Sequence, residues 1–243
     1  MRSASPRPVG RNVRLRAVTA LLAVTVSGGL AGCDSIGDAQ QVIDRAHLVN
    51  DLASRLDHAT ELTYTAEYQL PGGQHATITQ AQQPLRTAYS YPGGTFVTTP
   101  NATIDCRTDG GATTCTLTGP PSPSTEATTA LLRALHDHGL MPPTMVVGLL
   151  TAASMSPDAV IRQQDTTLAG EHATCTSVTG VENAAATEFD ACITSAGVLG
   201  SFKGVVDGKA TDVSLIRYAT TVTATAFDPP AGATIVDNRP KAS

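Results

Sequence analysis

Five cysteines carry the most reactive side chains of this 243-residue sequence. Two thiols close in sequence can join as a disulfide in an oxidising compartment, and an odd cysteine is then left without a partner inside the chain. Cys33 stands far from Cys106, Cys115, Cys175 and Cys192. It is therefore the cysteine whose chemistry needs a separate explanation.

The other four cysteines fall into two local pairs. Residues 109–111, Asp-Gly-Gly, lie midway between Cys106 and Cys115 and are typical of a hairpin turn. A polar loop likewise separates Cys175 from Cys192. Four cysteines allow three connectivities, and these turns favour the local one, with about 3 kcal/mol of stabilisation per bridge. The alternative is a zinc site, but the sequence holds no Cys-x-x-Cys spacing, so we predict two disulfides.

The residues before Cys33 have the layout of an export signal. Residues 1–16 contain five arginines and no acidic residue, and residues 17–32 are uncharged and mostly apolar. Sixteen helical residues would extend roughly 24 Å, which is short of the ~30 Å core of a bilayer. The segment is therefore expected to be a signal peptide and not a transmembrane helix.

Residues 30–33, Leu-Ala-Gly-Cys, resemble the lipobox of bacterial lipoproteins. The resemblance implies cleavage after residue 32 and a diacylglycerol thioether on Cys33, with acyl chains such as palmitate as the membrane anchor. Two acyl chains suffice for stable anchoring, so the expected location is the outer face of the cell membrane. An ordinary secretory signal with an incidental cysteine is the alternative.

The composition of residues 33–243 limits the partners. Eleven basic residues face 21 acidic ones, which gives a net charge of about −10. Only three lysines are present, so neither nucleic acid nor an anionic lipid surface is an expected partner through charge. No long linker divides these 211 residues, and we predict a single domain.

No catalytic pattern emerges from the remaining polar residues. Ser201 lacks the glycine spacing of a nucleophile elbow, and no P-loop, dinucleotide-binding or zinc-protease motif occurs. His136, Asp137 and His138 are expected at the exposed end of a helix, with the two imidazoles pointing in different directions. We therefore expect no catalysis, no metal and no cofactor apart from the acyl group on Cys33.

The pattern of apolar residues predicts an α+β fold. A helix is expected over residues 36–59, and helices over 127–138 and 144–154 form a helical insertion at about 124–156. The segments before and after this insertion alternate in polarity between Gly- and Pro-rich turns, which favours antiparallel strands. The predicted strands end with a long one over residues 212–227. Helices packed on one face of a large antiparallel sheet satisfy this order.

This element order resembles the LolA-like half-barrel of actinobacterial lipoproteins of the LppX and LprG type. The ending "AFDPPAGATIVD" is similar to the closing turn of that group. The resemblance implies a curved sheet whose concave face, together with the helical insertion, encloses acyl chains.

The apolar insertion is the candidate ligand-binding region. We predict that it forms a lid over the sheet with a lipid or other amphiphile beneath it, because apolar pockets suit such ligands. The expected function is a membrane-anchored carrier of a hydrophobic molecule. The alternative is a non-catalytic envelope protein with a solid core that acts by binding another protein, whose identity the sequence does not indicate. The proposed lining residues are Leu131, Leu132, Leu135, Met145, Val146, Leu149, Leu150 and Met155.

Overall fold

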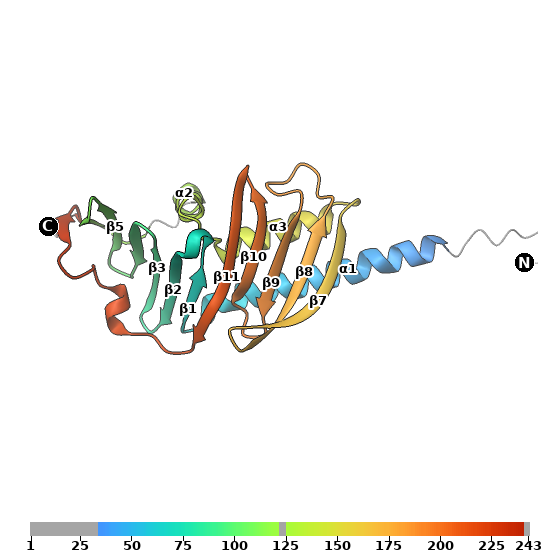
Figure 1. Cartoon of the computed structure of the whole chain (residues 1–243), viewed down its shortest axis with the longest axis horizontal. Coiled ribbons are helices and arrows are strands. Elements are labelled where there is room, and N and C mark those ends of the chain that lie inside the picture. The colour runs from blue at the N-terminus through green and yellow to red at the C-terminus, as the bar shows by residue number, and fades with distance from the viewer. Residues whose placement is uncertain (1–33, 122–124, 241–243) are drawn as a thin grey trace, which may run out of the picture.

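The computed structural model describes residues 34–121 and 125–240. The predicted signal peptide and Cys33 lie outside these residues. One open, curved sheet of twelve strands runs through the described chain, with helices on one side of it (Figure 1). The strands are β1 (Tyr64–Gln69), β2 (His75–Gln82), β3 (Leu85–Tyr91), β4 (Gly94–Thr98), β5 (Thr103–Asp109), β6 (Ala112–Thr118), β7 (Val160–Leu168), β8 (Glu171–Thr179), β9 (Phe189–Thr194), β10 (Leu199–Val206), β11 (Lys209–Ala219) and β12 (Thr234–Asp237).

The sheet is mixed, whereas the sequence predicted an antiparallel one. Its strand order is β12-β6-β5-β4-β3-β2-β1-β11-β10-β9-β8-β7. Each neighbouring pair of these strands is antiparallel except β12 with β6, where Thr234 lies opposite Thr114 in a parallel ladder. The α+β class is confirmed, and the parallel pair arises because the C-terminal segment returns across the sheet to its far edge.

Three helices of the described residues accompany the sheet, and their ends lie within two residues of the predicted ones. They are α1 (Asp34–His58), α2 (Thr125–Asp137) and α3 (Pro143–Met155). α3 begins at a proline, whose missing N–H costs nothing in the first helical turn. By the apolar criterion applied to the described residues, none of these helices could cross a membrane.

α1 and α3 pack against the same face of the sheet and form the main core with it (Figure 1). The turn between β9 and β10 lies directly on α1. Gly197 adopts a φ of +91° there, and a Cβ at this position would come within 2.5 Å of the Arg55 carbonyl oxygen. Only glycine permits this approach. The largest fully buried side chains are Phe202, Leu52, Leu56, Leu135, Met141, Leu150, Ile193, Leu199, Val49, Val97, Val146 and Val178.

The C-terminal segment covers the opposite face of β2–β6. β11 ends at Ala219, and residues 224–227 form a short 3-10 turn, so the predicted strand over 212–227 is wrong in its second half. Phe227 is buried against Val97 and Ala88, and the Arg86 guanidinium lies 4.3 Å from its ring centre. The strand stops because its last residues leave the sheet to cover apolar side chains on the outer face.

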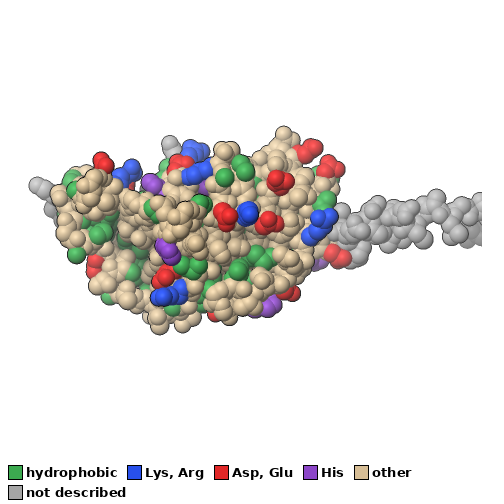
Figure 2. Space-filling model, in the orientation of Figure 1, with side chains coloured by type: hydrophobic (Ala, Val, Ile, Leu, Met, Phe, Trp, Pro, Cys, Tyr) green, Lys and Arg blue, Asp and Glu red, His purple; other side chains and the backbone are tan. Residues whose placement is uncertain are grey.

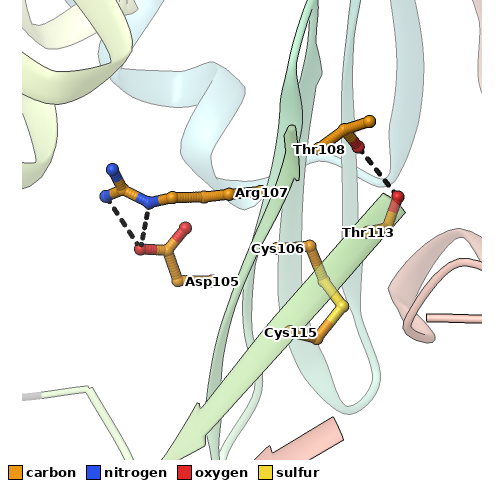
Figure 3. Close-up of a disulfide and its surroundings, with 6 residues drawn as sticks. All are labelled: Asp105, Cys106, Arg107, Thr108, Thr113 and Cys115. Atoms are coloured by element: carbon orange, nitrogen blue, oxygen red, sulfur yellow. Dashed lines mark hydrogen bonds and ion pairs between the residues drawn. A yellow bond between two sulfur atoms is a disulfide. The ribbon is translucent and has the colours of Figure 1, made fainter. Parts of the chain in front are cut away.

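Both predicted disulfides are present. Cys106 lies directly opposite Cys115 on β5 and β6, and Cys175 lies opposite Cys192 on β8 and β9. Figure 3 shows the first pair beside Arg107 on β5. Since successive strand residues alternate between faces, both bridges lie on the face opposite α1 and α3.

Candidate functional site

A cleft of about 190 Å³ lies between α2 and the strands β3–β5. Register explains why side chains from three strands meet there: Tyr89 lies opposite Phe96, and Phe96 lies opposite Asp105, so this row points to one face. α2 supplies the other wall through residues spaced three or four apart. The lining residues are Tyr91, Phe96, Asp105, Arg107, Leu131, Ala134, Leu135 and His138.

The inner part of the cleft is apolar and its mouth is charged. Phe96, Leu131 and Leu135 form the apolar part. At the mouth, the Arg107 Nη2 donates to the Asp105 Oδ2 over 3.1 Å, and its Nε approaches the same oxygen at 3.4 Å (Figure 3). The Arg107 side chain is 73% exposed, so its remaining donors face solvent.

Two aromatic rings close one side of the mouth. The rings of Tyr91 and His138 stack with their centres 4.3 Å apart and their planes at 19°. Burial raises the pKa of Tyr91, and the Asp105 carboxylate raises it further, against an opposing effect of Arg107. The Tyr91 hydroxyl therefore stays protonated at neutral pH and can donate a hydrogen bond at the mouth.

The C-terminal end of α2 is fastened to β11. His136 Nε2 lies 2.9 Å from the Thr211 hydroxyl oxygen, and Lys209 Nζ donates to the carbonyl oxygens of His136 and Asp137 over 2.7 Å and 2.5 Å. These carbonyls belong to the last turn of the helix, which has no partner for them within the helix. Lys209 thus caps α2 and holds it to the sheet.

His136 is buried, so the expectation of an exposed position was wrong for this residue and right for His138. Burial lowers the pKa of His136, and the nearby Lys209 charge lowers it further. Sequence could not distinguish the two histidines because the buried position depends on Thr211, which is distant in the chain.

The structure brings only two of the eight predicted lining residues into the cleft, namely Leu131 and Leu135. Leu132 is half-buried on α2, and Met155 is 74% exposed at the end of α3. The remaining residues belong to or pack against the main core. They are Met145, Val146, Leu149 and Leu150.

Sequence reasoning missed the strand side of the cleft. Asp105 and Arg107 alternate with Ile104 and Cys106 on β5, so the polar residues of this strand face α2 while its apolar residues face the C-terminal segment. An Asp-x-Arg pair on a strand was the available signal. Its partner Phe96 could be recognised only from the strand register.

Three other hollows among the described residues are not closed by a helix. One, of about 650 Å³, lies at the β12 edge beside the Asp237–Arg239 ion pair. Another, of about 330 Å³, lies over β8–β10 beside Asp190 and Lys203. The third, of about 270 Å³, lies over β3–β5 beside Cys106 and Pro230. Figure 2 shows acidic and basic side chains interspersed on the visible face without a basic patch. Within residues 34–121 and 125–240, no group of three or more His, Cys, Asp or Glu side chains is placed to hold a metal ion.

Comparisons with known proteins give structural similarity only. No family model and no curated protein matches the chain. An uncharacterized conserved protein from Thermus thermophilus is similar over 82% of this chain and 98% of its own, with 14% identity and a TM-score of 0.39. MucB is similar over 77% of this chain and 65% of its own, with 12% identity and a TM-score of 0.43.

Proposed function

We propose that the protein is an exported lipoprotein of LolA-like half-barrel fold, anchored to the outer face of the cell membrane through Cys33. It binds a hydrophobic or amphiphilic ligand in the cleft beneath α2 and catalyses no reaction. The observation that carries this proposal is the cleft itself, because an apolar interior with a charged mouth suits a ligand that is apolar at one end. The lipobox-like sequence at Cys33 supports the anchor.

The size of the cleft limits the ligand to one apolar group. Ligand pockets are usually about 300–1,000 Å³, and this cleft measures about 190 Å³. It therefore holds one end of a single acyl chain and not two whole chains. The exposed donors of Arg107 at the mouth favour a ligand with an anionic headgroup.

α2 is the element that can widen the cleft. Its final turn is fastened to β11 through His136 and Asp137. Widening of the cleft would have to displace Leu131, which packs against the main core from the preceding turn of α2. A longer acyl chain would then enter between α2 and β3–β5.

A second candidate function is a protein-binding envelope module with a solid core. The packing of α3 favours it, because Val146 and Leu150 are fully buried against α1 and the sheet. In that case the cleft would receive an apolar side chain of a partner protein instead of a lipid.

Native mass spectrometry of residues 34–243 with added dodecanoate distinguishes these functions. The expected result is a complex that Ala134→Trp abolishes, because the indole fills the cleft. Ala130→Trp is the matched control, since it is the same substitution one turn earlier on α2, at an exposed residue that does not line the cleft. Absence of a dodecanoate complex, or equal binding by both variants, would favour the protein-binding module.

The anchor is tested on the full-length protein from membranes. Trypsin releases the peptide of residues 33–45, because no lysine or arginine precedes Arg45 in this span. We expect this peptide to carry a diacylglycerol on Cys33 and to be absent from the membranes of cells that produce the Cys33→Ser variant. A peptide with a free thiol would refute the anchor.

A further inference from the structure

β7 is a long unpaired edge of the sheet. Its nine residues pair with β8 in an unbroken register from Val160 opposite Thr179 to Leu168 opposite Glu171. β12, at the other edge, has four residues. Within the described part of the chain, no strand pairs with the outer side of β7.

The hairpin turn determines which backbone groups point outward. Ala169 and Gly170 have φ values of 51° and 83°, as in a type I′ turn, which makes Leu168 and Glu171 a hydrogen-bonded pair. In antiparallel ladders, bonded and non-bonded pairs alternate. This assignment requires that His172, the next residue of β8, bonds toward β9 and not toward β7. It does so, because its carbonyl oxygen accepts from the Ser195 amide over 2.8 Å. The residues of β7 whose N–H and C=O groups point away from β8 are Ile161, Gln163, Asp165 and Thr167.

This edge lacks the usual protection against strand addition. Proteins commonly blunt an edge with proline, a bulge, lysine or a short strand. β7 has none of these, and its two charges, Arg162 and Asp165, are of opposite sign. Its outer side is thus an uninterrupted row of backbone donors and acceptors.

The N-terminal part of α1 lies beside the β7 edge (Figure 1). Figure 1 shows the N-terminal part of α1 projecting past β7 on the helix side of the sheet. Arg45 Nη1 donates to the Ala159 carbonyl oxygen just before β7, and the helix extends from there back to Asp34, roughly 17 Å. A further strand would lie about 4.8 Å beyond β7, and α1 would therefore lie beneath it. Exposed apolar side chains occur at this end of the molecule, on α1, at the end of α3 and at the start of β7: Ile43 (48%), Met155 (74%) and Val160 (49%).

A second copy of this chain does not fit the edge in an antiparallel pairing. Pairing β7 with β7 of another copy would bring the partner's own α1 and α3 into the layer that the projecting part of α1 already occupies. An extended peptide carries no such layer. We infer that the β7 edge binds an extended segment of another protein as a thirteenth strand of the sheet. The projecting part of α1 would lie beneath this added strand (Figure 1). Main-chain hydrogen bonds would supply affinity, and alternate apolar side chains of the segment would pack toward the exposed Ile43, Met155 and Val160.

Random ten-residue peptides displayed on phage, selected against the full-length protein, provide the probe. We expect the enriched peptides to alternate apolar and polar residues and to bind at least tenfold more weakly to Gln163→Pro. Proline removes the outward N–H at this position, and an edge strand tolerates it there. Gln163→Ala is the matched control, which keeps the N–H and should bind within twofold of the unsubstituted protein.

Hydrogen exchange on the unsubstituted protein gives a second measurement that does not depend on the folding of the proline variant. Peptide binding should slow exchange of the Ile161, Gln163, Asp165 and Thr167 amides and leave the already bonded Arg162 and Gln164 amides unchanged. The inference is overturned if no peptide is enriched, if binding leaves the four outward amides unprotected, or if Gln163→Pro and Gln163→Ala bind equally. A dimer in solution that Gln163→Pro dissociates would also overturn it, in favour of a second copy.

Discussion

Leu150 on α3 distinguishes a solid core from a ligand cavity. Its side chain is 0% exposed and packs in the main core, in which α1 and the sheet also take part. Replacing a fully buried leucine by alanine costs about 2–5 kcal/mol, because transfer free energy is lost and a void remains. We expect about 3–4 kcal/mol for Leu150→Ala. With a urea m-value of about 2 kcal/mol per molar, the unfolding midpoint should fall by about 1.5–2 M.

Leu132→Ala is the matched control for this prediction. Leu132 is half-buried on α2, so the same substitution should lower the free energy of unfolding by about 1 kcal/mol or less. Both variants are unfolded in urea without reductant and followed by circular dichroism. If Leu150→Ala costs no more than Leu132→Ala, α3 borders a space that is empty or filled by a ligand, and the assignment of α3 to a solid core is refuted.

Two further predictions concern His136 and a disulfide. Because the pKa of His136 is lowered in the folded state, the unfolded chain binds this proton first as pH falls below about 6.5, and stability is lost there. His136→Gln should reduce the difference between the urea midpoints at about pH 7.5 and about pH 5.5, and an unchanged difference would contradict the burial of a neutral imidazole. Replacing Cys175 and Cys192 together by alanine should cost about 3 kcal/mol, since the bridge spans 17 residues of sequence. For a domain of this size, calorimetry should show a Tm about 6–12 °C lower, and a fall of less than about 2 °C would contradict this expectation.

Local features of the fold could be predicted from the sequence because their signals are local. The glycines that follow Asp109 have positive φ and close the hairpin that brings Cys106 opposite Cys115. The proline at residue 143 marks the start of α3, and the apolar spacing of α1 indicated its length. In each case, turn chemistry or periodicity within a few residues determines the result.

Features that depend on distant parts of the chain could not be predicted in this way. Thr234–Asp237 is a short, exposed segment with no strand pattern of its own, and it becomes β12 only because the chain reaches β6. The cleft requires α2 and β5 to meet, and the burial of His136 requires Thr211. Apolar composition indicated that α3 must be covered, but only the tertiary structure shows that α1 and the sheet cover it.

The pairing of β1 with β11 has a consequence for the order of events during folding. Thr65 lies opposite Ala219, so the two halves of the sheet are joined by strands from opposite ends of the chain. As the chain emerges N-terminus first, hairpins β2–β3 and β5–β6 can close early, since their contacts are local. The sheet becomes continuous only when nearly the whole chain has been synthesised. The C-terminal segment can then cover the outer face of β2–β6. A chain built this way remains incompletely folded until synthesis is almost finished.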